Sequence, residues 1–133
     1  MKFFGITVLL MLPVLAFAQQ PMSEKDQEKM FYENIEKKVE QYTTQFDLED
    51  WQVFYVDSIM INNSIEMKNE LMALSTAKVS NADFYVAVQD KWSEATYLAF
   101  QKIFDEQQWA KFLKQGGARD KKARDKRAAK RNK

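Results

Sequence analysis

The sequence predicts an all-α fold, a small bundle or curved array of about four antiparallel helices, as a monomer or a dimer. Three observations support this prediction. Glycine and proline are scarce, with 3 Gly and 2 Pro in 133 residues, which favours long helices over a turn-rich β-sandwich. Apolar residues recur at three- and four-residue spacing, as they do on one face of a helix. Several segments also begin with the residue pattern of a helix N-terminus.

Residues 1–18 have the composition of a secretory signal peptide. Lys2 gives a positively charged start, an apolar stretch follows to Phe17, and Ala16-Phe17-Ala18 is a small-x-small cleavage site. The stretch is shorter than the roughly 20 residues of a membrane-spanning helix, although an uncleaved anchor is the alternative. Gln19 rather than Cys follows the cleavage site, which argues against a lipoprotein. We therefore expect a periplasmic or secreted mature protein.

Four helices are expected in the domain that follows, residues 19–117. They span about 23–44, 48–74, 81–103 and 106–115, and the polar run 62–64 could break the second of them. The first carries Phe31, Ile35, Val39 and Tyr42 on one face. The last ends at Gly116-Gly117, where glycine can adopt the left-handed conformation that closes a helix.

Two of the expected helix starts share one pattern, a capping box with a hydrophobic staple. In this pattern a side chain caps the helix, a partner lies three residues on, and apolar residues flank them. The two sets are Phe46, Asp47, Asp50 and Trp51, and Phe104, Asp105, Gln108 and Trp109. Ser80 and Asp83 form a third, similar box. The first two sets predict either an internal repeat or two independently well-made helix starts.

At these residues the chain resembles the Spy/CpxP family of periplasmic stress proteins, whose mark is two copies of Leu-Thr-x-x-Gln. Residues 104–108 fit with Phe for Leu and Asp for Thr, whereas residues 46–50 end in Asp in place of Gln. The resemblance also covers the overall plan of signal peptide, helices and absent cysteine. It implies a thin, curved helical dimer that binds unfolded or aggregating proteins without ATP. Convergence on a capping box is the alternative explanation.

The residue types needed for most reaction chemistry are missing. The chain has no His and no Cys, so it lacks the usual general base near neutral pH, the thiol nucleophile and the commonest zinc ligands. The pairs Glu66/Glu70 and Asp90/Glu94 could hold a hard cation, but a solvated helix face explains them more simply. We expect no catalytic residue, no cofactor and no metal site.

The second helix is apolar on two faces. Trp51, Phe54, Tyr55 and Ile59 lie on one face, and Val53, Val56, Met60, Met67, Leu71 and Leu74 lie on another. Such a helix is either central in the bundle or offers one face to a partner, as a dimer seam or a client surface. We predict a candidate apolar binding surface that contains Phe54, Val56, Met60, Met67 and Leu71.

Residues 118–133 form a basic tail on an acidic body. Its cations are Arg119, Lys121, Lys122, Arg124, Lys126, Arg127, Lys130, Arg131 and Lys133. The tail has no large apolar residue, so we expect it to be disordered or a frayed helix. Export argues against nucleic acid as its partner. Anionic lipid or lipopolysaccharide, the acidic body of a second copy, or no partner at all are the options that stay open.

The expected function is non-enzymatic, chaperone-like binding of exposed apolar segments of client proteins in the cell envelope, as part of a stress response. The alternative is an envelope-associated structural protein that docks on an anionic surface through its basic tail. The expected partner is therefore a client protein, a second copy of the chain, or anionic lipid or lipopolysaccharide.

Overall fold

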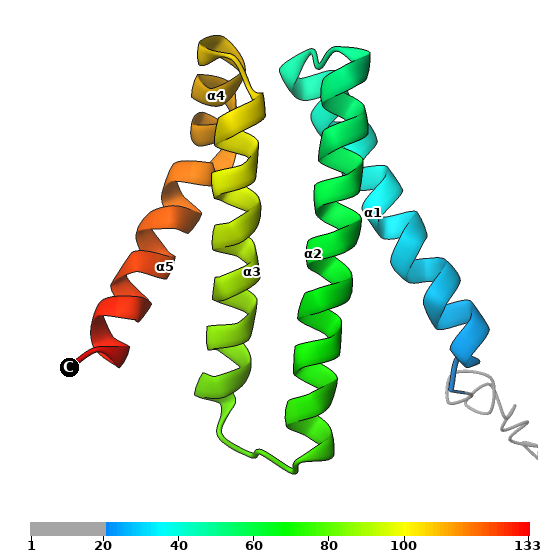
Figure 1. Cartoon of the computed structure of the whole chain (residues 1–133), viewed down its shortest axis with the longest axis vertical. Coiled ribbons are helices and arrows are strands. Elements are labelled where there is room, and N and C mark those ends of the chain that lie inside the picture. The colour runs from blue at the N-terminus through cyan, green and yellow to red at the C-terminus, as the bar shows by residue number, and fades with distance from the viewer. Residues whose placement is uncertain (1–20) are drawn as a thin grey trace, which may run out of the picture.

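The computed structural model describes residues 21–133 and is all-α in that range (Figure 1). The helices are α1 (Glu24–Phe46), α2 (Asp50–Thr76), α3 (Ala82–Ile103), α4 (Glu106–Phe112) and α5 (Ala118–Arg131), with a π-helical turn, Leu113–Gly117, before α5. The predicted signal peptide, residues 1–18, lies outside the described residues. Among the helices described, none combines the length and the apolar character that crossing a membrane requires.

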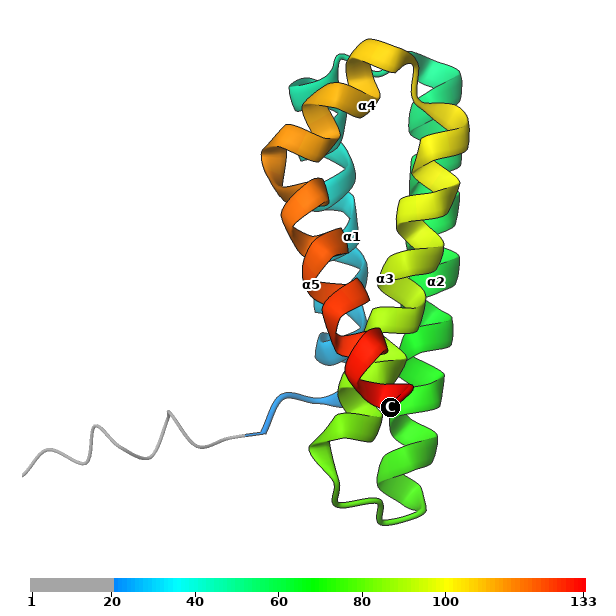
Figure 2. The same ribbon diagram turned by 90° about the vertical axis from the view of Figure 1, so that its left-hand side faces the viewer.

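The helices form the predicted small bundle. The long helices α2 and α3 are an antiparallel pair and have the most extensive contact with each other. Helix α1 packs on α2, and α5 packs on α3. Figure 2 shows α1 and α5 in one layer and the α2–α3 pair in the other. The short α4 follows α3 and lies at the end of the bundle that also holds the connection from α1 to α2.

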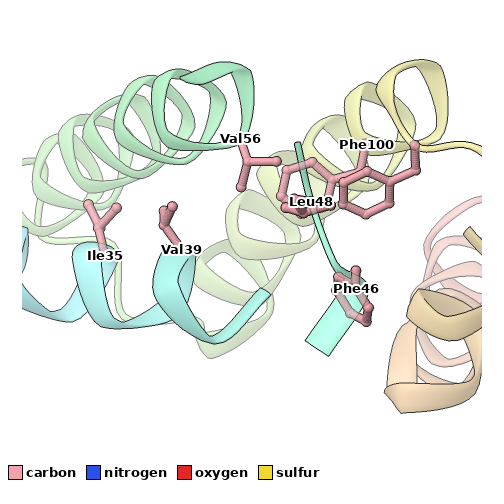
Figure 3. Packing of buried hydrophobic residues seen from close by; sticks show 7 residues of the cluster. Ile35, Val39, Phe46, Leu48, Val56 and Phe100 are labelled. Atoms are coloured by element: carbon pink, nitrogen blue, oxygen red, sulfur yellow. The ribbon is translucent and has the colours of Figure 1, made fainter. Parts of the chain in front are cut away.

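The core follows the seam between these two layers. Its buried apolar residues are Ile35, Val39, Phe46, Leu48, Val56, Phe100 and Phe104. Figure 3 shows Ile35 and Val39 projecting from α1 toward α2. The rings of Phe46, Phe100 and Phe104 pack on one another and on Phe112. Burying each such side chain contributes roughly 1.5–3 kcal/mol, so this end of the bundle is its most strongly stabilised part.

The N-terminal ends of the helices differ in part from the prediction. Asp47 does not cap α2 but ends α1, in a left-handed conformation with φ 51°. Helix α2 begins two residues later, after Glu49, whose N–H donates to Oε1 of Gln52 at 2.9 Å. Asn81 rather than Ser80 caps α3 and accepts from the N–H of Asp83. Both caps were predicted at the wrong residue, because Asp47 and Ser80 are favoured N-cap types and a neighbouring polar residue takes their place.

The predicted capping box of α4 is confirmed. Asp105 accepts from the N–H of Gln108 at 2.8 Å, and Oε1 of Gln108 accepts from the N–H of Asp105 at 2.9 Å. Helix α2 is also continuous through residues 62–64. There Asn63 donates from Nδ2 to the hydroxyl of Thr96 on α3, so the polar run serves a contact between helices and does not mark a break.

The predicted disordered or frayed tail is wrong, because residues 118–131 form the ordered helix α5. The two glycines redirect the chain between α4 and α5. Gly116 has φ 123°, a value that disfavours other residues. A Cβ on Gly117 would lie 2.7 Å from Cε1 of Phe112 and 2.8 Å from its carbonyl oxygen. The turn therefore brings α5 back along α3.

Candidate binding surfaces

Two glutamines form hydrogen bonds between the two halves of the bundle, α1–α2 and α3–α5. Nε2 of Gln52 donates to Oε1 of Gln108 at 2.6 Å, and Nε2 of Gln108 donates to Oε1 of Gln52 at 2.9 Å. Each Nε2 also donates to a carbonyl of the opposite half, that of Ile103 for Gln52 and that of Asp47 for Gln108. Both side chains are buried. The amide pair is therefore fully hydrogen-bonded and fixes the two helix starts against each other.

This pair corrects the register of the predicted repeat. Gln52 and Gln108 are 56 residues apart, and at the same spacing Leu48 corresponds to Phe104 and Glu49 to Asp105. Leu48 and Phe104 are both buried in the core. The repeated unit is thus residues 48–52 and 104–108, and the earlier match of residues 46–50 was two residues out of register. The repeat was predicted to start around Asp47, a favoured cap residue, and the predicted unit therefore did not include Gln52.

The two apolar faces of α2 have opposite surroundings. Val56 is completely buried and Val53 and Met60 pack against the core, so this face is structural. The other face is open only in part: Ile59 is half-buried and packs against the core, whereas Trp51 is 50%, Phe54 66% and Tyr55 50% exposed. We call Trp51, Phe54 and Tyr55 the outer aromatic face. Their rings contact one another edge-on, with centroids 6.2 Å apart for Trp51 and Tyr55 and 5.6 Å apart for Phe54 and Tyr55.

The predicted binding surface is therefore divided between the two faces. Phe54 is exposed as expected, but Val56 is a core residue and cannot contact a partner. Met60, Met67 and Leu71 are half-buried, and Met60 packs against the core. Farther along α2, Ile61 and Ile65 are half-buried, Ile61 against the core, and Met72 is 57% exposed. The exposed apolar surface of α2 is thus concentrated at its start, on Trp51, Phe54 and Tyr55.

Helix α5 is held on α3 by ion pairs. Nε and Nη2 of Arg127 both donate to the carboxylate of Asp90 at 2.8 Å, and Arg131 donates to the same carboxylate at 3.3 Å. Glu94 accepts from Arg124 at 3.1 Å and also from Lys121. The Asp90/Glu94 pair, interpreted from sequence as a solvated face, is therefore the anchor of the tail.

The hydrogen bonds from Arg127 hold the pKa of the Asp90 carboxyl below its usual value against the opposing effect of burial. Asp90 is 8% exposed and therefore carries its charge in a partly desolvated position. A buried carboxylate with a bidentate arginine is a strong, oriented contact. The contact explains how a segment without large apolar residues packs in an ordered way.

The remaining cations of α5 point the other way. Helical spacing places Arg119, Lys122, Lys126, Lys130 and Lys133 opposite the side that faces α3, and all of them are exposed. We call these residues the outer basic stripe. Among the residues that the structure describes, Lys122, Lys126 and Lys130 have no ion-pair partner within 4.0 Å. Helix α5 is thus basic on two sides, and the cations of one side form ion pairs with α3.

Residues 21–133 contain no cluster of three or more acidic side chains placed to hold a metal ion. Comparison of the chain with models of protein families, with curated proteins and with solved structures gives no match in any of the three.

Proposed function

We propose that this protein is an exported, non-enzymatic helical binding protein that holds exposed apolar segments of client proteins in a chaperone-like manner. The outer aromatic face is the observation that supports the proposal most directly. Three adjacent aromatic side chains, each half or more exposed, are costly to leave in water and are the residue types that dominate protein-binding surfaces.

The surroundings of this face favour weak binding of varied clients. Ser58 and Asn62 lie between the apolar residues on the exposed side of α2, so the surface mixes apolar contacts with hydrogen-bonding groups. The indole N–H of Trp51 donates to Glu49 at 2.6 Å, which orients this ring at the start of the helix. Met72 adds a flexible side chain that adapts to different partners.

The corrected repeat supports the same proposal. In the register of residues 48–52 the chain keeps both the Leu and the Gln of the Leu-Thr-x-x-Gln motif, with Glu49 in the Thr position. The resemblance to the Spy/CpxP family is therefore closer than in the register read from the sequence. It implies client binding in the periplasm during envelope stress, which agrees with the expected signal peptide.

The test is suppression of aggregation of a chemically unfolded model client by the chain from Gln19 onward. Light scattering would be followed from sub-stoichiometric to equimolar ratios. We expect the protein to lower the scattering, and the triple variant Trp51→Ser, Phe54→Ser, Tyr55→Ser to lose most of this effect. The matched control replaces Phe84 with Ser, since Phe84 is an exposed aromatic residue of α3. Absence of suppression at every ratio would refute the proposal.

A second candidate function rests on the outer basic stripe. Docking on anionic lipid or lipopolysaccharide would use Lys122, Lys126 and Lys130, each worth about 1 kcal/mol near a charged surface, while the inner cations keep α5 on α3. This function is compatible with client binding, because the stripe and the outer aromatic face are on different helices.

A further inference from the structure

Helix α5 lies at the edge of the bundle and is attached to α3 through charges (Figure 1). The apolar residues of α5 are all alanines. Its inner side instead carries four cations that pair with carboxylates of α3: Lys121, Arg124, Arg127 and Arg131. Helix α1, by contrast, packs on α2 through the buried Ile35 and Val39 (Figure 3). The attachment of α5 therefore depends on ion pairs, whereas that of α1 depends on apolar burial.

The ion pairs of α5 are unevenly balanced and open to competition. Four cations share only two carboxylates, those of Asp90 and Glu94. The side chains of Arg127 and Arg131 are 43% and 37% exposed, so competing anions reach both guanidinium groups from the solvent. Nη2 of Arg124 is buried without a hydrogen-bond partner among residues 21–133. Such a group destabilises the docked state, and it regains water when α5 leaves α3.

The rest of the bundle does not depend on α5. None of the buried apolar core residues belongs to this helix. Gly116 and Gly117 precede α5, and Gly116 has φ 123°. Glycine adopts a wider range of backbone angles than other residues, and hinge motions concentrate at a few such positions. Helix α5 can therefore move at these glycines while the core stays packed.

An extended anionic surface offers more partners to α5 than α3 does. Residues 118–133 carry nine cations against two carboxylates, Asp120 and Asp125. The outer basic stripe reaches such a surface while α5 is docked, but the four inner cations reach it only after release. We propose that α5 is a releasable helix: a surface of anionic lipid headgroups draws its inner cations away from Asp90 and Glu94, and α5 leaves α3. This inference rests on the second candidate function, docking on an anionic surface.

Release uncovers aromatic surface on α3. In the docked state Nζ of Lys121 lies 5.6 Å from the ring centroid of Tyr97, and Cζ of Arg124 lies 5.3 Å from it. Tyr97 and Trp92 also line the cleft between the two layers, and Arg124 forms part of its α5 side. Without α5 this cleft is open on one side. Contact with the lipid surface is thus coupled to exposure of aromatic rings that the docked helix covers.

The test measures the distance between α3 and α5 by electron paramagnetic resonance. The chain has no cysteine, so a nitroxide pair can be attached at Gln101→Cys and Ala129→Cys, both exposed positions. We expect one narrow distance distribution in solution and with phosphatidylcholine vesicles, and a broad, longer one with phosphatidylglycerol vesicles. A control pair on α1 and α2, Glu36→Cys and Asn69→Cys, should not change. Inorganic phosphate at the same phosphate concentration should leave α5 docked, because a single small anion engages few cations.

Neutralising the two anchors should have the effect of release. We expect Asp90→Asn with Glu94→Gln to show the broad distribution without vesicles. This variant should bind phosphatidylglycerol vesicles about tenfold more tightly, because its released state is no longer a minor population. The matched control, Glu33→Gln with Glu66→Gln, removes the same charge at exposed positions and should keep the narrow distribution.

The outcomes separate release from docking. A chain that sediments with phosphatidylglycerol vesicles at an unchanged α3–α5 distance would overturn the release of α5 and leave docking intact. Equal release by inorganic phosphate would overturn the requirement for a lipid surface. A chain that does not sediment with these vesicles would refute docking and release together.

Discussion

The side-chain amides of Gln52 and Gln108 hydrogen-bond each other in both directions between the starts of α2 and α4, at one end of the bundle. Each glutamine also accepts from the backbone N–H of its own helix start, that of Glu49 or that of Asp105. The same side chains thus complete two turns and join them. Because both amides are buried, loss of either one leaves several polar groups without partners.

A double-mutant cycle measures this coupling. We expect Gln52→Leu and Gln108→Leu each to lower the free energy of unfolding by roughly 2–3 kcal/mol. Each substitution leaves buried donors and acceptors of the other half without hydrogen-bond partners. The double variant should lose less than the sum, with a coupling energy of about 1 kcal/mol or more. Urea denaturation followed by circular dichroism gives these values. Additive losses would show that the two helix starts are independent.

Phe54 and Phe100 should separate binding from stability. Phe100 is 1% exposed and Phe54 66%. We expect Phe100→Ala to cost about 3–5 kcal/mol of unfolding free energy, and Phe54→Ala to change it by no more than about 0.5 kcal/mol. Thermal melts check stability, and aggregation assays of the same samples check binding. A large loss of stability in Phe54→Ala would mean that Phe54 belongs to the folded core.

The stability contributed by Asp90 depends on pH. Its pKa is lowered in the folded state, so this contribution is fully present above the unfolded value of about 3.9 and is lost as pH falls through the folded pKa. The melting temperature of wild type should therefore exceed that of Asp90→Asn at pH 7, and the two should converge under acid conditions. Glu36→Gln, at an exposed position of α1, serves as control. A difference that persists unchanged at the lowest pH would contradict the ion-pair explanation.

Gly117 should not tolerate a side chain. A Cβ at this position would meet the ring and the carbonyl of Phe112, and we expect Gly117→Ala to cost roughly 1–3 kcal/mol by overpacking. Lys114→Ala, at an exposed position in the same turn, should have little effect. Urea denaturation compares the two variants. Wild-type stability of Gly117→Ala would indicate that α5 approaches α4 less closely than the structure has it.

The outer basic stripe can be tested without removing α5. Truncation at Gly117 would also uncover Asp90 and Glu94, so point variants are cleaner. We expect the triple variant Lys122→Ser, Lys126→Ser, Lys130→Ser to lose sedimentation with anionic vesicles at low salt. A variant with Ser at the exposed Lys102, Lys111 and Lys114 should keep it. Equal sedimentation of both variants would exclude the stripe as the docking site.

The sequence was sufficient for helices α1 to α4 and for one of the two halves of the repeat. Three- and four-residue apolar spacing located α1, α2 and α3, because a helix must bury a continuous face. The box of Asp105 and Gln108 was predictable since its two partners are local. The contact between Gln52 and Gln108 was not, since the two side chains meet only after the halves pack.

Packing also decided the two features that the sequence misjudged. The tail lacks apolar residues, and apolar periodicity therefore predicts no packing for it. Its order comes from ion pairs to Asp90 and Glu94. These partners are distant in the sequence, so local residue patterns do not predict the pairs. Likewise, periodicity predicts two apolar faces for α2, but packing against α1 and α3 decides that Val56 is buried and Phe54 exposed.

Fluorescence of Trp51 tests the central claim most directly. A variant with Trp92→Phe and Trp109→Phe keeps Trp51, which is 50% exposed, as its single indole. If clients bind on the outer aromatic face, titration with the unfolded client should shift the emission of Trp51 to shorter wavelength and saturate where aggregation is suppressed. Emission that stays unchanged while this variant still suppresses aggregation would show that clients bind elsewhere.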